Sequence, residues 1–128
     1  MSYTQKQIDK FNRQKYIAQM EKVSKNIFRM LRDENVGSKD FVLKLSKLKK
    51  DLDERAEVQL DSEYHQQLKS YIVRLHRMTC LNETFCDKNL DDMREAEMSN
   101  LNRLQKLKNG MSYKKEKHRA KRQNDEWD

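Results

Sequence analysis

The stretch from Tyr64 to Phe85 is the most apolar part of the chain, and it constrains the fold most strongly. Its apolar residues recur at three- and four-residue steps: Leu68, Tyr71, Ile72, Leu75, Met78 and Phe85. Because a helix turns about 100° per residue, these side chains fall within an arc of roughly 140°. Such an arc is wide enough to contact two neighbouring helices. The pattern therefore predicts a central helix around which the rest of the chain packs.

The scarcity of helix-breaking residues indicates what surrounds this helix. The 128 residues include no proline and only two glycines, which argues against sheet folds that need frequent turns. Only 35% of residues are hydrophobic and 38% are charged, a balance typical of helices that each bury one stripe. We expect an all-α fold: an elongated, coiled-coil-like antiparallel bundle of three to four long amphipathic helices with a basic C-terminal tail.

The first predicted helix begins at a capping box formed by Thr4 and Gln7 and can extend to Asn35. One apolar stripe covers its second half: Tyr16, Met20, Val23, Ile27, Met30 and Leu31. Ile8 and Phe11 lie about 100° or more away from that stripe. Residues 1–14 are thus either the first part of this helix or a separate arm, and Ile8 and Phe11 are candidate partner-binding residues. The expected bundle spans residues 15–110.

Two further predictions concern the next helices. Gly37 suits a left-handed helix end and Ser38 suits an N-cap, so a short turn should make the first two helices an antiparallel hairpin. The second helix should bury one face: Phe41, Val42, Leu45, Leu48, Leu52, Ala56 and Leu60. Asp61 and Ser62 can cap the third helix, but no glycine or proline separates the two, and a single rod is the alternative.

The last helix is expected after a turn or kink within residues 82–89, with Asp87 as its cap. It carries a common apolar face: Leu90, Met93, Leu101, Leu104 and Leu107. Gly110 is its predicted end. Residues 111–128 would then form a basic tail that is flexible when free, because it has little apolar content.

Two cationic regions point to an anionic partner for this chain of formal charge +7. One lies on the first helix: Lys22, Lys25, Arg29 and Arg32. The other lies in the tail: Lys114, Lys115, Lys117, Arg119, Lys121 and Arg122. Both are candidate nucleic-acid-binding residues, and with no helix-turn-helix or RNA-recognition signature they would contact the backbone without strong sequence preference. The alternatives are a solvated helix face and a solubilising tail.

The remaining features of the sequence do not indicate a chemical activity. His76, Cys80, Glu83 and Asp87 have helical spacing and metal-ligand side chains, but no second ligand set accompanies them, so we predict no metal, no cofactor and no catalysis. Cys80 and Cys86 point to different sides of a helix and should be reduced thiols, which favours a cytoplasmic or nuclear protein. No apolar run approaches the length of a membrane span, so we expect no integral membrane association.

Trp127 is the single tryptophan and stands between Glu126 and Asp128. These three residues resemble the tryptophan-acidic peptides that kinesin light chains bind in basic grooves. The resemblance implies that Trp127 is a partner-binding residue. The alternative is a side chain that folds back onto the bundle.

Together these patterns predict a non-enzymatic helical adaptor or assembly subunit of a larger complex. It would bind protein partners, or a copy of itself, by helix packing, while its basic surfaces contact nucleic acid. Two alternatives remain: nucleic-acid binding as the main activity, and an export or secretion chaperone that holds a partner helix.

Overall fold

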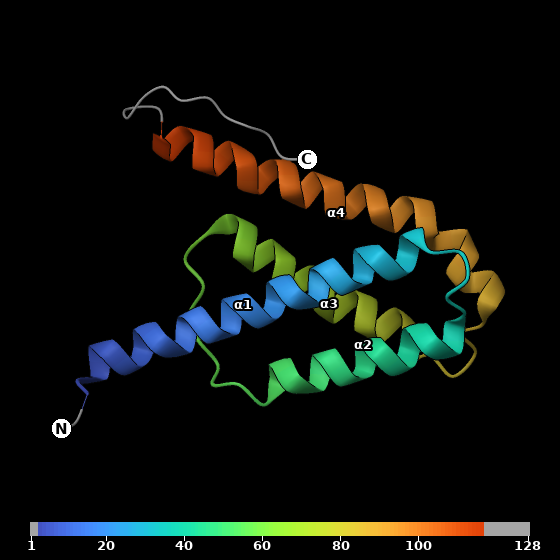
Figure 1. Cartoon of the computed structure of the whole chain (residues 1–128), viewed down its shortest axis with the longest axis horizontal. Coiled ribbons are helices and arrows are strands. Elements are labelled where there is room, and N and C mark those ends of the chain that lie inside the picture. Colours follow the sequence, from blue (N-terminus) through green and yellow to red (C-terminus); the bar gives the residue numbers. More distant parts are fainter. Residues whose placement is uncertain (1–2, 117–128) are drawn as a thin grey trace.

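A computed structural model describes residues 3–116 of the chain, and the side chains of residues 3–110. This part contains four helices and no strand: α1 (Gln5–Arg32), α2 (Ser38–Asp53), α3 (Glu63–Thr79) and α4 (Asp87–Glu116). Each helix runs opposite to the one before it (Figure 1). The predicted all-α class is therefore confirmed. Residues 117–128, most of the predicted basic tail, lie outside the described residues.

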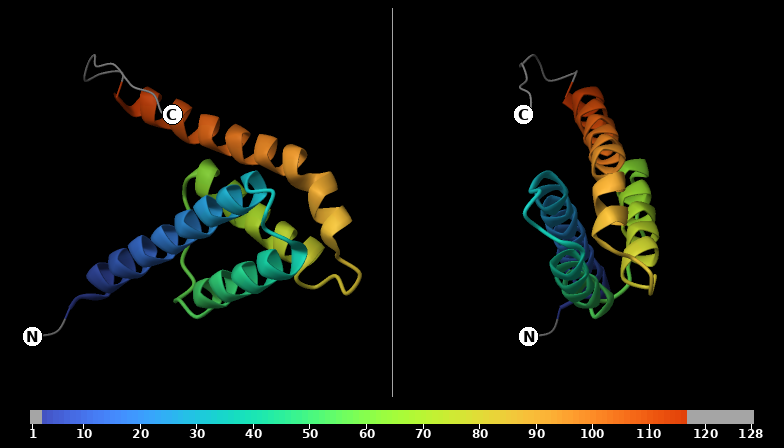
Figure 2. Two further views of the ribbon diagram at one scale, coloured as in Figure 1. Left: turned by 45° about the vertical axis from the view of Figure 1, so that its right-hand side comes forward. Right: turned by 90° about the vertical axis from the view of Figure 1, so that its right-hand side faces the viewer.

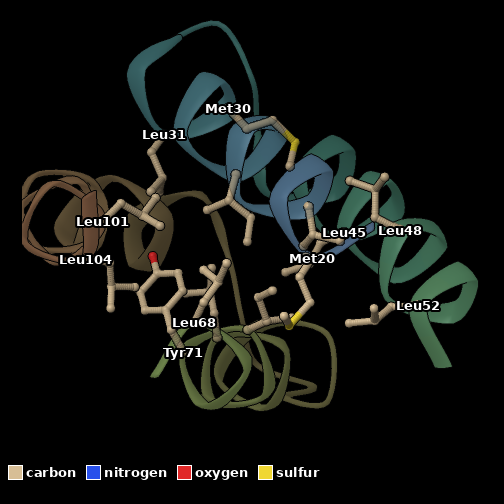
Figure 3. Packing of buried hydrophobic residues seen from close by; sticks show 14 of the residues in the cluster. Met20, Met30, Leu31, Leu45, Leu48, Leu52, Leu68, Tyr71, Leu101 and Leu104 are labelled. Atoms are coloured by element: carbon tan, nitrogen blue, oxygen red, sulfur yellow. The ribbon is translucent and has the colours of Figure 1, made fainter. Parts of the chain in front are cut away.

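The helices form two layers, with the α1–α2 hairpin packed on the α3–α4 hairpin (Figure 2). All four contribute to a single core between the layers (Figure 3). α3 buries Leu68, Tyr71, Ile72 and Leu75 of its predicted stripe. Over the described side chains, however, α1 buries more apolar residues than any other helix. α1, as much as α3, is therefore the helix around which the others pack.

α1 begins at the predicted capping box. The main-chain N–H of Gln7 donates to Thr4 Oγ1 (3.2 Å), and the N–H of Thr4 donates to Gln7 Oε1 (3.0 Å). The helix continues without a break to Arg32, so residues 5–14 and the half of α1 that packs in the core form one helix. No side chain from Tyr3 to Lys15 is buried, and this half of α1 extends beyond the bundle (Figure 1).

The corner between α1 and α2 differs from the prediction. Gly37 has φ −87° and is not left-handed, and Ser38 is the first residue of α2 and not its cap. The cap comes from a distant residue, because the N–H of Ser38 donates to Asp87 Oδ1 (2.7 Å). A Cβ at Gly37 would lie 3.3 Å from the same oxygen, so glycine leaves room for this contact. Asp87 itself is the first residue of α4 and not its cap.

Arg94 completes this corner from α4. Its guanidinium donates to the main-chain carbonyls of Met30 (2.8 Å), Leu31 (2.9 Å), Asp33 (3.1 Å) and Val36, and to the Asp91 carboxylate (2.9 Å). The last carbonyls of a helix have no partner within the helix, and Arg94 supplies one for the end of α1. Asp87 and Arg94 are seven residues apart, on one face of α4, so this face binds both ends of the corner.

The connection between α2 and α3 also differs from the prediction. α2 ends at Asp53, so Ala56 and Leu60 lie outside the helix, and α2 and α3 are not one rod. The acidic side chains Asp53, Glu54 and Glu57 disfavour further helix here, because a helix C-terminus carries partial negative charge. The connection still covers the core, since Val58 and Leu60 pack against it. Ser62 caps α3 as predicted and accepts from the N–H of His65 (3.2 Å).

The last two boundaries are shifted as well. α3 ends at Thr79, and Phe85 packs from the following loop against Phe41, with ring centroids 6.3 Å apart. α4 passes through Gly110 and ends at Glu116, so the predicted stop is wrong. A glycine within a helix costs only about 1 kcal/mol, and the helix-forming residues after it outweigh that cost.

Candidate partner-binding surface

An unbroken α1 joins two groups of candidate residues that the sequence left separate. Helical geometry places Ile8, Phe11, Ala18 and five cations of α1 within an arc of about 120° on the side away from the core. All eight are exposed: Ile8, Phe11, Lys15, Ala18, Lys22, Lys25, Arg29 and Arg32. This outer face extends about 36 Å from Ile8 to Arg32 at 1.5 Å per residue.

The N-terminal end of the outer face is apolar. Ile8 is 38% exposed and Phe11 is 47% exposed. The Tyr3 ring meets Phe11 edge to face, with centroids 5.6 Å apart, and adds aromatic surface that the sequence did not indicate. Apolar groups exposed together on a projecting helix are typical of protein contact sites.

The C-terminal end of the outer face is cationic. Lys22, Lys25, Arg29 and Arg32 are all exposed, as predicted, and none forms an ion pair within the described part of the chain. Arg32 stacks over the Phe28 ring at 5.7 Å, which brings a cation beside an aromatic surface. The four charges extend over about 15 Å of the helix.

Beside this cationic end, α1 and α4 are held together at two points. One is the set of Arg94 hydrogen bonds to the end of α1. The other is an ion pair between Lys108 Nζ and Glu21 Oε2 (3.0 Å), with Lys108 also lying over the Tyr64 ring. Between the two points lies a groove of about 290 Å³. We call it the α1–α4 groove.

The α1–α4 groove has an apolar floor and a cationic rim. Phe28, Tyr64, Leu68, Leu101 and Leu104 form the floor. In Figure 3, Leu104 lies beside Tyr71 of α3, and Leu101 lies beside Leu31 of α1. The charged lining residues are all cations, namely Lys25, Arg29 and Arg32, and the remaining lining residues are Ser24, Asn102 and Gln105.

The floor of this groove is uncharged at neutral pH. Burial, with a smaller contribution from the Glu21 carboxylate, raises the pKa of Tyr64 to about 12, so its phenol stays protonated. Burial likewise lowers the pKa of the adjacent His65, which favours the neutral imidazole. The positive charge of the groove therefore comes from its α1 rim.

A second cleft, of about 440 Å³, lies between α3 and α4 and contains Arg74 and Arg103. Arg74 pairs with the buried Glu97 carboxylate at 2.9 Å. Burial raises the pKa of Glu97, but hydrogen bonds from Arg74 and Asn100 outweigh it and hold the pKa below its ordinary value. The Arg74 charge is thus neutralised within the protein. Arg103 remains, but one cation makes this cleft less attractive to an anion than the three cations of the α1–α4 groove.

The structure does not bring the metal-like residues together. Because α3 ends at Thr79, His76, Cys80, Glu83 and Asp87 share no helical face, and the Asp87 carboxylate is bonded to Ser38. Among the described residues, no three His, Cys, Asp or Glu side chains gather as metal ligands would.

The predicted tail residues are only partly placed. Lys114 and Lys115 lie in the last turn of α4. Lys117, Arg119, Lys121, Arg122 and Trp127 lie outside the described residues.

Sequence reasoning missed the groove, although one signal pointed to it. Phe28 lies about 110° from the centre of the buried stripe of α1, on the flank of the helix. A large aromatic at such a position needs a second neighbour, which α4 provides at the groove. Arg94 gave no such signal, because the main-chain carbonyls to which it donates are more than 55 residues away along the chain.

Over residues 3–116 these features define an all-α fold of four packed helices, with an exposed helix face that is apolar at one end and cationic at the other. No protein-family model matches the chain, and no curated protein or solved structure shows significant similarity to it. None of the helices, as far as the structure describes them, is both long and apolar enough to cross a membrane.

Proposed function

We propose that this chain is a non-enzymatic helical adaptor or assembly subunit that binds a partner protein along the outer face of α1. The observation that carries the proposal is the unbroken α1. It places the apolar Ile8 and Phe11 and the cations from Lys22 to Arg32 on one exposed face about 36 Å long. An apolar anchor beside a row of charges is the usual composition of a helix-packing interface.

The charge of α1 selects the partner. The projecting half of α1 carries Lys6, Lys10, Arg13 and Lys15 against one acid, Asp9. Two such halves would repel each other, so a second copy of the chain is disfavoured as the occupant. The partner we propose is an acidic amphipathic helix of another protein, whose apolar side covers Phe11 while its carboxylates face Lys22, Lys25 and Arg29.

Nucleic-acid binding is the second candidate, and the exposed cations of α1 favour it. Lys22, Lys25, Arg29 and Arg32 form a row that could follow a phosphate backbone, and Lys114 to Arg122 would add contacts. Such binding would be largely independent of sequence. It gives no role to the exposed Phe11 and Ile8, which is why we rank it second.

Size-exclusion chromatography with light scattering tests the two candidates. The purified chain is run at physiological and at high salt with two probes, a single-stranded oligonucleotide and a designed helical peptide. The peptide carries leucines at i, i+3, i+4 and i+7 and glutamates elsewhere. The adaptor proposal expects a peptide complex that survives high salt, because apolar contacts are not screened.

Variants connect that complex to α1. Phe11→Ser and Arg29→Glu should each weaken peptide binding, whereas Lys44→Glu, at an exposed position of α2, should not. A monomer that binds the oligonucleotide tightly at physiological salt, and binds no acidic peptide, would overturn the adaptor proposal in favour of nucleic-acid binding.

A further inference from the structure

The α1–α4 groove is a feature that binding along the outer face of α1 does not require. Arg94 at one end and the Lys108–Glu21 ion pair at the other hold α1 and α4 in place. Neither helix fills the space between these points, where Tyr64 and Leu68 of α3 form part of the floor. The groove thus belongs to the packing of the bundle and does not depend on one surface side chain.

The groove and the outer face share three residues. Lys25, Arg29 and Arg32 lie both on the outer face of α1 and on the rim of the groove. A helix bound along the cationic end of α1 would therefore lie beside the groove opening. One large apolar side chain of that helix can enter the groove while neighbouring carboxylates remain on the rim.

We propose that the α1–α4 groove receives an apolar anchor side chain, such as leucine or tryptophan, from the acidic helix of the partner. This inference rests on the proposed adaptor function and specifies how its partner is held. The floor offers only apolar and neutral groups, and the cations lie on the α1 side alone. The occupant therefore presents its apolar residue to the floor and its acidic residues toward α1.

The size of the groove favours a side chain over a free small molecule. Its 290 Å³ lies at the lower limit of small-molecule sites, which range from about 300 to 1,000 Å³. A pocket of this size instead suits one or two bulky side chains, the typical hot spot of a protein interface. The cationic rim also disfavours a second copy, whose α1 would bring like charges to it.

The test uses the full chain and the acidic leucine peptide, with affinity measured by isothermal titration calorimetry. Ser24→Trp and Asn102→Trp each place a large side chain at the groove opening, one from α1 and one from α4, without removing a core residue. Ser46→Trp is the matched control on α2, since Ser46 is half-buried like Ser24 and does not line the groove. Thermal unfolding of each variant verifies that it folds.

We expect either groove variant to weaken peptide binding about tenfold or more, the loss expected when a hot-spot pocket is closed. Replacing the central leucines of the peptide by alanine should have a similar effect on the wild-type chain. The Ser46→Trp control should bind as the wild type does. In leucine methyl spectra, the peptide should shift the resonances of Leu101 and Leu104.

The outcomes separate the two proposals. If Arg29→Glu abolishes binding but both groove variants bind normally, the groove inference is wrong and the adaptor proposal stands. If no acidic peptide binds, both fail. A tenfold gain in peptide affinity on Trp127→Ala would instead identify the chain's own acidic segment as the occupant. If the groove variants weaken oligonucleotide binding, nucleic acid is the occupant of the groove. Each of these last two results would overturn the inference.

Discussion

Replacing Arg94 should destabilise the fold more than replacing any exposed arginine. Arg94 is only 8% exposed, and its guanidinium donates to four main-chain carbonyls at the corner between α1 and α2. Arg94→Met keeps much of the apolar stem but removes every donor. The carbonyls of Met30 and Leu31 take part in buried hydrogen bonds and would lose their charged partner.

The size of the effect follows from those two buried bonds. A hydrogen bond to a charged group contributes about 1.5–3 kcal/mol, and the partly buried carbonyls of Asp33 and Val36 can rebind water. We therefore expect Arg94→Met to lower the free energy of unfolding by about 3–5 kcal/mol, a large share of the stability of a typical domain. Arg94→Lys should lower the free energy of unfolding by about half as much, because an ammonium group cannot reach the same set of carbonyls.

Urea unfolding followed by circular dichroism at 222 nm measures this loss. Arg103→Met is the matched control, since Arg103 is an exposed arginine of the same helix whose hydrogen bonding, among the residues described, is to Asn100 alone. The control should change stability by no more than about 0.5 kcal/mol. If Arg94→Met were as stable as Arg103→Met, the corner would not depend on Arg94 and the reasoning above would be wrong.

Three further substitutions test other contacts by the same unfolding assay. Gly110→Ala should stabilise the protein by about 0.5–1 kcal/mol, because Gly110 lies within α4 and an added Cβ meets nothing within 4 Å. Asp87→Asn should lower the urea midpoint, since hydrogen bonds from Ser38 hold the pKa of Asp87 below its ordinary value. The difference in urea midpoint between the wild type and Asp87→Asn should be largest above about pH 5. It should shrink as the pH falls through the lowered pKa, because wild-type Asp87 itself then becomes neutral. Glu97→Gln should lower the free energy of unfolding by about 1–2 kcal/mol, because Arg74 would lose its charged partner yet remain partly solvated. An unchanged free energy of unfolding would show that the ion pair does not stabilise the fold.

The parts of the fold that the sequence predicted depend on contacts within a few residues. The Thr4–Gln7 box and the Ser62 cap each join groups three residues apart, and both are confirmed. The buried stripes of α1 and α3 follow from helical periodicity alone. Ser38 was misread because its partner, Asp87, is 49 residues away.

The candidate site likewise has features that the sequence predicted and features that it did not. The exposure of Phe11, Lys22 and Arg29 follows from their angular position on one helix, and the sequence was sufficient to predict it. The α1–α4 groove depends on how far apart two helices lie, which Arg94 and Lys108 determine from a distant part of the chain. Periodicity contains no information about that separation.

The contacts of Asp87 and Arg94 have a consequence for the order of folding. The turn after α1 is complete only when residues from α4 supply its hydrogen bonds. During synthesis the first two helices would emerge with these bonds missing, so a stable hairpin intermediate is not expected from them alone. The bundle should instead form in one cooperative step, with a single unfolding transition shared by all four helices. A change at this corner would then destabilise the whole bundle, including the surface that we propose for the partner.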